Sequence, residues 1–202
     1  MKQSTKWLSN QCPKKHVSMA AINEDTFTQP SFPLRDRLAR VLWNVVQATI
    51  FRCSPRPLHE WRSAVLRFFG ARIGCGVHVY PGAKIWAPWN LVIADEAGVG
   101  DRVILYSQGR IEIGRRAVIS QGVHICAGTH DYERAGFPLV TKPITIRDHV
   151  WVAAEAFVHA GVTIEEGAVI GARSVVTKDM PAWTVCAGHP CKPIKERIWR
   201  PD

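Results

Sequence analysis

The stretch IEEGAVIGARSVV at residues 164–176 decides the fold, because an aliphatic residue stands at every sixth position. A six-residue period matches neither the period of a helix nor the alternation of a strand. The same period extends back to Ile73 with three breaks, and repetition of this kind is typical of a solenoid, whose coils bury their apolar faces against one another. The residues that head the repeats are Ile73, Val79, Ile85, Ile93, Val99, Leu105, Ile113, Ile119, Ile125, Ile146, Val152, Val158, Ile164, Ile170 and Val176.

Three repeats make one turn of a triangular coil, with the aliphatic residues inside and small residues at the corners. Stacked turns would pair as parallel strands about 4.8 Å apart, so the repeats predict a prism of about five coils. Two steps are eight residues long instead of six, from Ile85 to Ile93 and from Leu105 to Ile113. Because both steps add two residues at the same corner, we expect one insertion to stack on the other.

A longer interruption separates Ile125 from Ile146 and carries the loop 129–143, which begins Thr129-His130-Asp131-Tyr132. A loop that interrupts a solenoid on one face commonly carries its functional site. The spacing alone is equally compatible with a solvated surface loop, so both interpretations stay open at this point.

The 202 residues carry a formal net charge of +9. This length fits one domain with an extension, and the positive charge favours anionic partners, which include a phosphorylated cofactor, nucleic acid and a membrane surface. No apolar run approaches the roughly 20 residues of a bilayer span, and the N-terminus lacks a signal-peptide pattern. The cysteines lack the spacing of a zinc site or a disulfide framework. We therefore expect a cytoplasmic protein.

Two helices are expected before the repeats. Residues 1–32 are polar and aperiodic and predict a flexible arm, whereas residues 33–72 predict one amphipathic helix and a second over 58–69. These helices would cap the open first coil, which a stacked prism needs. Because both helices carry arginines, peripheral contact with the inner face of a membrane is a second interpretation. The apolar face of the first helix comprises Leu34, Leu38, Val41, Leu42, Val45 and Val46.

These features together resemble the hexapeptide-repeat O-acetyltransferases, whose fold is a left-handed parallel β-helix. Within that family the chain resembles the galactoside and maltose branch, and most closely the acetyltransferases of colanic acid and related exopolysaccharide biosynthesis. The resemblance rests on the repeats, on Thr129-His130-Asp131-Tyr132 and Val150-Trp151-Val152, and on the closing run 175–194. It implies a mainly β chain, with a helical cap at 33–72, the β-helix at 73–188 and a tail with a short C-terminal helix at 189–202.

The resemblance also implies an enzyme that moves an acetyl group from acetyl-CoA to a hydroxyl of a sugar or polysaccharide precursor. The catalytic histidine of the family falls on His130, which would act as general base, since imidazole titrates closest to neutrality. Transfer would be direct, because no Ser or Cys stands in a recognisable nucleophile pairing. The positions that match the family's coenzyme site are Trp151, Ala154, Ala172, Thr177, Lys178, Lys192 and Lys195.

The acceptor side matches the family less well. An asparagine that organises the substrate in the family falls on Gly100, so another group would have to stabilise the developing oxyanion. Gln108, Asp131 and Tyr132 are the candidates for acceptor contacts. The resemblance further implies a homotrimer with active sites at the subunit boundaries, with neither a metal ion nor a nucleic acid as partner.

Two other functions remain open. A zinc protein like the carbonic anhydrases of this fold would need three histidines, of which His124 and His130 could supply two, although their spacing departs from that family's. His149 or His159 would be the third. A noncatalytic scaffold could instead use the basic helices to bind a membrane-associated synthesis complex.

Overall fold

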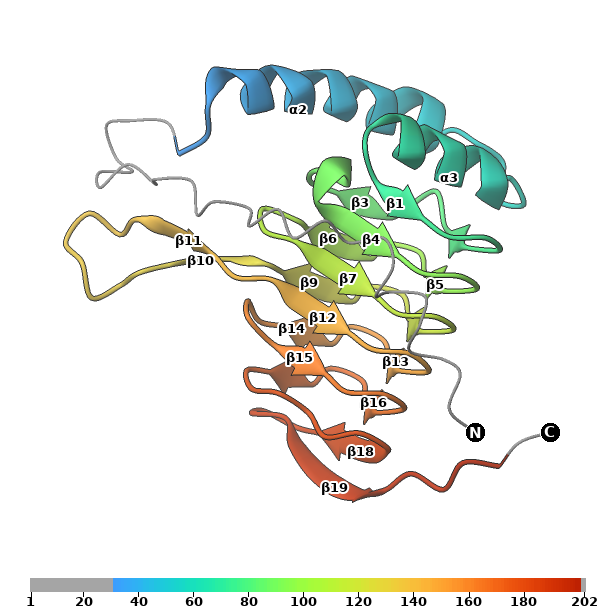
Figure 1. Ribbon diagram of the computed structural model, residues 1–202, viewed down its shortest axis with the longest axis vertical. Coiled ribbons are helices and arrows are strands. Elements are labelled where there is room, and N and C mark those ends of the chain that lie inside the picture. Colours follow the sequence, from blue (N-terminus) through green and yellow to red (C-terminus); the bar gives the residue numbers. More distant parts are fainter. Residues whose placement is uncertain (1–30, 201–202) are drawn as a thin grey trace, which may run out of the picture.

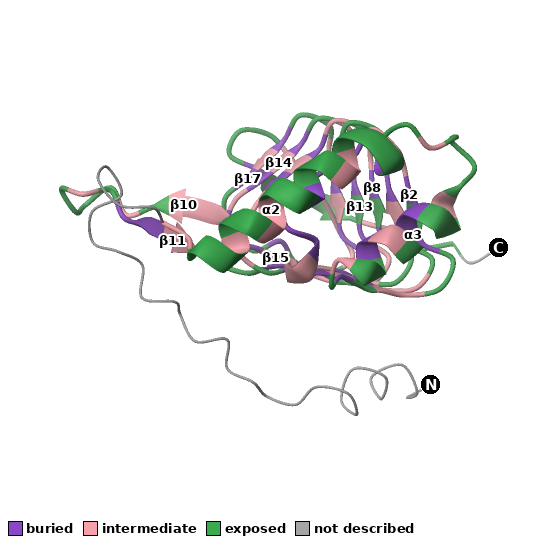
Figure 2. Ribbon diagram, turned by 90° about the horizontal axis from the view of Figure 1, so that it is seen from above, coloured by how far each residue is buried: buried purple, intermediate pink, exposed green. Residues whose placement is uncertain are grey.

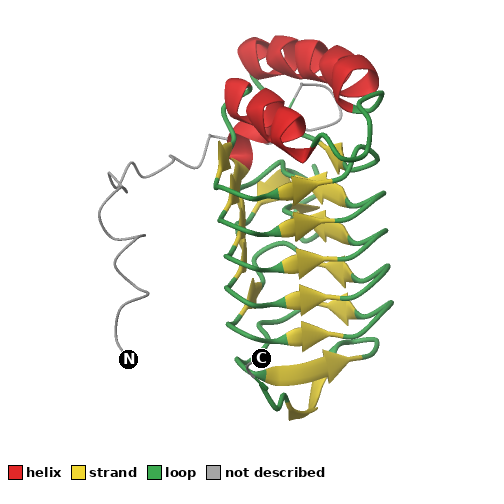
Figure 3. Ribbon diagram, turned by 90° about the vertical axis from the view of Figure 1, so that its right-hand side faces the viewer, coloured by secondary structure: helices red, strands yellow, loops and turns green. Residues whose placement is uncertain are grey.

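The computed structural model describes residues 31–200, in which a triangular β-helix stands beneath two helices (Figures 1 and 3). The arm expected at 1–32 lies almost entirely outside the described residues. Each turn contributes one short parallel strand to each of three faces, and β18 begins a sixth turn on the second face. The predicted parallel β-helix of about five coils with helices before it is therefore confirmed. The first face comprises β1 (Arg72–Ile73), β4 (Leu91–Ile93), β7 (Ile111–Ile113), β12 (Ile144–Ile146) and β15 (Thr163–Ile164).

Neighbouring strands on a face pair so that the residues heading the repeats lie next to one another. On the first face, Ile93 pairs with Ile113 and Ile113 with Ile146, so residues that head the repeats stack in columns. The second face comprises β2 (His78–Val79), β5 (Gly98–Val99), β8 (Val118–Ile119), β13 (Trp151–Val152), β16 (Val169–Ile170), β18 (Thr184–Ala187) and β19 (Lys192–Glu196). The third face comprises β3 (Lys84–Ile85), β6 (Ile104–Tyr106), β9 (His124–Cys126), β14 (Phe157–Val158) and β17 (Val175–Val176).

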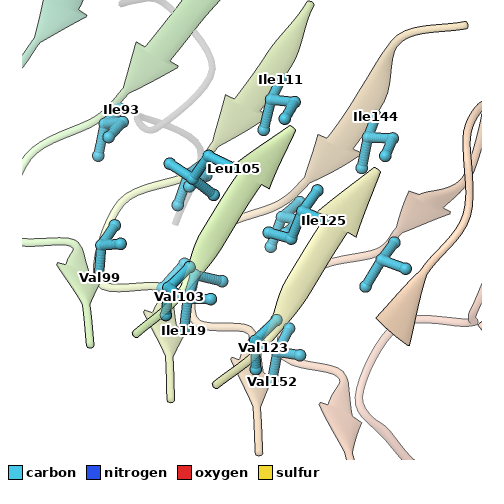
Figure 4. Close-up of a cluster of buried hydrophobic side chains, with 14 of the residues drawn as sticks. Ile93, Val99, Val103, Leu105, Ile111, Ile119, Val123, Ile125, Ile144 and Val152 are labelled. Carbon is cyan, nitrogen blue, oxygen red and sulfur yellow. The ribbon is translucent and has the colours of Figure 1, made fainter. Parts of the chain in front are cut away.

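The core is the interior of the prism, where these columns meet (Figure 4). Leu105, Ile119 and Ile125 are almost fully removed from solvent. Burial of one such side chain contributes about 1.5–3 kcal/mol. Since every turn repeats the arrangement, the buried core is continuous along the prism.

The insertions in the repeat all fall at the corner between the third and the first face, and they stack. The first forms the 3₁₀ helix η2 (Pro88–Asn90), and the Asn90 amide donates to the carbonyl of Ser107 in the turn below (2.9 Å). The Ser107 hydroxyl in turn bonds Ala87. The third insertion is a hairpin of β10 (Gly128–His130) and β11 (Leu139–Thr141), which projects from this corner (Figure 1). The corner is therefore a continuous column that carries the His130 hairpin.

The helical cap comprises α2 (Leu34–Val46), the π-helical turn η1 (Gln47–Phe51) and α3 (His59–Phe68). Helix α2 covers the first coil with Trp43, which is fully buried and donates its indole N–H to the Ile85 carbonyl (2.7 Å). The aliphatic face of this helix was expected to cover that coil, and this expectation is wrong. Leu34 and Leu38 are exposed, because Trp43 projects from the opposite side of the helix.

The C-terminal helix expected in 189–202 is also not formed. The chain instead turns back as β19 and pairs antiparallel with β18, so that Lys192 lies opposite Ala187. Pro193 within this segment lacks the backbone N–H that a helix interior needs. Pairing with β18 also covers the free edge of the last strand on the second face.

Candidate functional site

His130 ends β10 on the projecting hairpin, where its side chain is exposed. Its Nδ1 lies 2.6 Å from the carbonyl oxygen of Phe137 in the same hairpin. Because a carbonyl can only accept, Nδ1 carries the proton and Nε2 keeps its lone pair. The hairpin therefore presents a histidine in the tautomer that a general base requires, with Nε2 available to a substrate.

The base of the hairpin rests on Gln108 in the turn above. A Cβ at Gly128 would approach Gln108 Oε1 to 1.9 Å, so only glycine fits there without displacing the amide. The Gln108 Nε2 donates to the Tyr106 hydroxyl (3.1 Å). Gln108 thus lies at the root of the hairpin, where it supports the segment that carries His130.

The two residues that follow His130 have different surroundings: Asp131 is bonded within the hairpin, and Tyr132 is exposed to solvent. The Asp131 carboxylate accepts from the Glu133 backbone N–H (3.2 Å) and pairs with Arg134 (3.4 Å), so it holds the turn of the hairpin. Tyr132 is 78% exposed. Of these two, Tyr132 is the side chain that is presented outward.

Thr177 and Lys178 follow β17 at the corner from which the hairpin projects, in a later turn. Both side chains are exposed. Along this corner the sequence-predicted residues are therefore Gln108, His130, Thr177 and Lys178.

The remaining candidates lie on the second face and at its corner with the third face. Ala154 and Ala172 occupy equivalent positions in successive turns, and the Ala154 carbonyl accepts from the Arg173 backbone N–H (2.9 Å). Lys192 comes to the same corner through its pairing with Ala187, while Lys195 pairs with Val185 along the second face. Two lysines thus lie at the lower end of a line of small residues, an arrangement suited to a phosphate-bearing chain.

Trp151 lies on the outer surface of the second face and remains about half exposed. Its indole N–H donates to the Ser120 hydroxyl oxygen (2.9 Å). Ser120 accepts this bond and keeps its own O–H for another partner. The pair therefore forms an exposed apolar ring beside a free hydroxyl donor.

Ser120 lines a pocket of about 450 Å³ together with Arg56, Tyr80, Gly100 and Arg102. A Cβ at Gly100 would come within 2.9 Å of the Gln121 backbone nitrogen, so no side chain fits there unless the backbone shifts. The Arg56 guanidinium stacks over the Tyr80 ring at 4.9 Å. Gly100, the position that matches the family's asparagine, is thus packed closely against the backbone of the next turn, and the pocket beside it is bordered by two arginines.

Arg56 is held in place by a buried arginine of α3. Arg62 is fully buried, and its guanidinium donates to the carbonyls of Arg56 (2.6 Å) and Pro55 (2.9 Å). Burial lowers the pKa of Arg62 from its usual value, although an arginine stays charged across the physiological range. The cap therefore also fixes one wall of the pocket.

Sequence reasoning missed Arg56, Tyr80, Arg102 and Ser120. The available signal was Gly100 itself, which departs from the family and is followed directly by Asp101-Arg102. Arg56 and Tyr80 gave no signal, because they come from the cap and the first turn and reach the pocket only in the folded chain.

One chain does not bring the two groups of candidates together. The His130 hairpin projects from one end of the triangular cross-section, whereas β13 with Trp151 lies toward the other, and Figures 1 and 2 agree on this separation. A single chain therefore holds the His130 hairpin and Trp151 in separate places.

The histidines considered as zinc ligands do not form a cluster with one another. His124 packs between the rings of Tyr106 and Phe157 on the third face, and burial lowers its pKa. His149 packs against Trp199 instead. Residues 31–200 hold no group of three or more side chains that could bind a metal ion.

Comparisons with known proteins agree with this fold. The family model "Bacterial transferase hexapeptide (six repeats)" matches residues 143–178. The chain is 48% identical over 157 residues to WcaF of Escherichia coli K12, a protein named for acetyl transfer in colanic acid biosynthesis, and the match covers 78% of this chain and 86% of WcaF.

Two solved structures are similar as well. A maltose O-acetyltransferase from Clostridium difficile 630 superposes with a TM-score of 0.74 at 27% identity, over 83% of this chain and 90% of that chain. A galactoside acetyltransferase in complex with coenzyme A gives a TM-score of 0.73 at 27% identity, over 79% and 81% of the two chains.

Proposed function

Because this chain belongs to the hexapeptide-repeat acetyltransferase family, we propose that it moves an acetyl group from acetyl-CoA to a hydroxyl of a sugar or polysaccharide precursor. Family membership makes the chain an acyl-CoA-dependent acetyltransferase. The observation that carries the acceptor chemistry is the exposed His130, whose Nδ1 lies 2.6 Å from the Phe137 carbonyl oxygen, so that in the neutral imidazole Nε2 holds the lone pair. A hydroxyl must lose a proton to attack a thioester, and Nε2 would take it.

The transfer would run directly between the two substrates. Nε2 of His130 accepts the proton as the acceptor oxygen bonds to the thioester carbonyl carbon, and the tetrahedral intermediate then expels the coenzyme thiolate. The imidazolium returns the proton to that thiolate. The carbonyl of Phe137 stabilises the imidazolium between these steps, because it still accepts from Nδ1.

The active enzyme would be a homotrimer. His130 and Gln108 lie at one corner of the prism, whereas Trp151 lies on a different face. Prisms packed side by side would bring the hairpin of one chain to the second face of the next, and cyclic closure prevents open polymers. Each site would then combine the base of one subunit with the pocket at Gly100 of another.

The acceptor would bind in this pocket, and the Ser120 hydroxyl would supply the oxyanion donor that the family's asparagine provides elsewhere. Its oxygen already accepts from Trp151, so its proton is available to donate to a bound substrate. Arg56 and Arg102 border the same pocket and favour an acceptor that carries negative charge, such as a sugar phosphate. Asp101 reduces this positive charge without cancelling it.

A screen with labelled acetyl-CoA tests the proposal. We expect label on one or more members of a panel of free sugars, nucleotide sugars and lipid-linked oligosaccharides, with the phosphate-bearing members preferred. The product is an ester, so mild alkali should release the label as acetate. Absence of transfer to every member, with acetyl-CoA binding shown by calorimetry, would favour the scaffold alternative.

The coenzyme assignment predicts a separate effect for Lys192→Ala and Lys195→Ala. Each change should raise the Michaelis constant for acetyl-CoA by about 3-fold to 10-fold and leave kcat nearly unchanged, because contacts to distant phosphates bind ground and transition states alike. Initial-rate kinetics measure both constants. Lys84→Ala, an exposed lysine near the cap, serves as the matched control. If both C-terminal variants keep the wild-type Michaelis constant, these lysines do not bind the coenzyme.

A further inference from the structure

Helix α2 presents an aliphatic stripe to solvent, comprising Leu34, Leu38, Val41, Leu42 and Val45. These five side chains are between 58% and 66% exposed. At about 100° per residue, Leu34, Val41 and Val45 lie within roughly 20° of the direction opposite Trp43. Because Trp43 is buried and bonded to Ile85, the helix cannot turn the stripe toward the prism without losing that contact. Contiguous apolar surface of this kind marks an interaction site.

The stripe occupies the end of the prism and not one of its sides. Helix α2 crosses the top of the molecule, above the three faces (Figures 1 and 3). Seen from above, its outer surface is largely exposed (Figure 2). Side-by-side packing of prisms would therefore leave the stripe uncovered.

Positive charges border the aliphatic stripe, and the acidic residue of α2 lies on the other side of the helix. On the helical wheel, Arg35 lies on one side of the stripe and Arg37 on the other, and both are exposed. The helix has one acidic residue, Asp36, which lies on the side of Trp43. Arg40 is also on that side, where it stacks over Trp86 at 4.1 Å. The outward face is thus aliphatic in the middle and purely basic at its borders.

We propose that α2 docks the enzyme onto an anionic membrane surface, with the aliphatic stripe entering the boundary between headgroups and acyl chains. An apolar face bordered by arginines is the pattern of helices that lie in the membrane interface. No helix within residues 31–200 is long and apolar enough to cross a bilayer. In the proposed trimer three such helices would face the same way, and their binding would be multivalent.

Charge complementarity favours this occupant over two others. A second copy related by two-fold symmetry would add its own Arg35 and Arg37 to the same interface and bring no acidic residue of α2 to neutralise them, which is unfavourable. Residues 1–30 of the same chain contain four lysines against Glu24 and Asp25, so they also match a basic rim poorly. An anionic lipid surface satisfies the stripe and the arginines together.

Flotation of the full-length protein with lipid vesicles tests the proposal. Wild-type protein should bind vesicles of phosphatidylcholine mixed with phosphatidylglycerol, and bind pure phosphatidylcholine less. Leu38→Glu should weaken binding by about 10-fold to 100-fold, because it places a charge where the exposed leucine would enter the membrane interface. Arg35→Ser combined with Arg37→Ser should reduce the preference for the anionic vesicles, as should added salt. Ile198→Glu, an 80% exposed residue at the far end of the prism, is the matched control and should bind as wild type.

Several outcomes would overturn the proposal. Wild-type protein that leaves both kinds of vesicle unbound would do so, and so would equal binding by Leu38→Glu and wild type. A Leu38→Glu variant that changes molecular mass in light scattering would show that the stripe is instead an interface between copies of the chain. The assay does not depend on acetyl transfer, so its result is independent of the proposed activity.

Discussion

His130→Ala should lower acetyl transfer by about 10²-fold to 10⁴-fold, the range expected when a general base is removed. The loss should appear in kcat, because His130 takes a proton only as the reaction proceeds, and the Michaelis constant for acetyl-CoA should change little. Its side chain is exposed on the hairpin, so the prism should keep its stability. Initial rates measure the first effect and thermal unfolding the second.

Two further measurements make this result specific. Glu133→Ala alters an exposed side chain on the same hairpin and should cost far less, which controls for disturbance of the loop. Mixed trimers of His130→Ala subunits with Ser120→Ala subunits should regain activity, because some sites then combine an intact base with an intact pocket. Wild-type turnover by a folded His130→Ala variant would reject the base. Full activity in a species that light scattering shows to be monomeric would reject the shared site.

Trp43→Ala should lower the free energy of unfolding by about 3–5 kcal/mol, the range for truncating a buried tryptophan. The indole is fully buried at the contact between α2 and the first coil, and its ring packs against Phe51 and Phe69 at 5.8 and 5.1 Å. Truncation leaves a cavity and also leaves the Ile85 carbonyl without its donor. Denaturant unfolding at fixed protein concentration measures the change.

Trp43→Phe and Trp61→Ala separate the causes. The phenylalanine keeps most of the ring and loses the hydrogen bond, so its cost should be smaller, about 1–3 kcal/mol. Trp61 lies on α3 but is 47% exposed, so its truncation should cost less than that of Trp43. Equal stability of Trp43→Ala and wild type would mean that this residue does not fasten the cap.

The sequence by itself determined the β-helix. Aliphatic residues at every sixth position can all point into one core only if each six-residue repeat forms one side of a coil. The sequence also determined that the steps Ile85–Ile93 and Leu105–Ile113 interrupt the same corner, since the length of each step fixes the phase. Only the structure showed that the third interruption is a hairpin at that corner too. The candidate base followed from residue identity, as the motif around His130 resembles that of a known family. These properties depend on neighbours in the chain, which a single sequence displays.

The tertiary structure decided what depends on distant surfaces. Periodicity predicted that Leu34 and Leu38 share a face of α2. Trp43 on the other side of the helix is the residue that is buried, because that side faces the first coil and the Ile85 carbonyl. The segment Lys192–Glu196 forms a strand because it pairs with the otherwise unpaired edge of β18. The tautomer of His130 depends on a carbonyl seven residues away. The pocket depends on Arg56, which a buried arginine holds across from Gly100. Local pattern fixes which residues point the same way, and only the surface they meet decides which of them are buried.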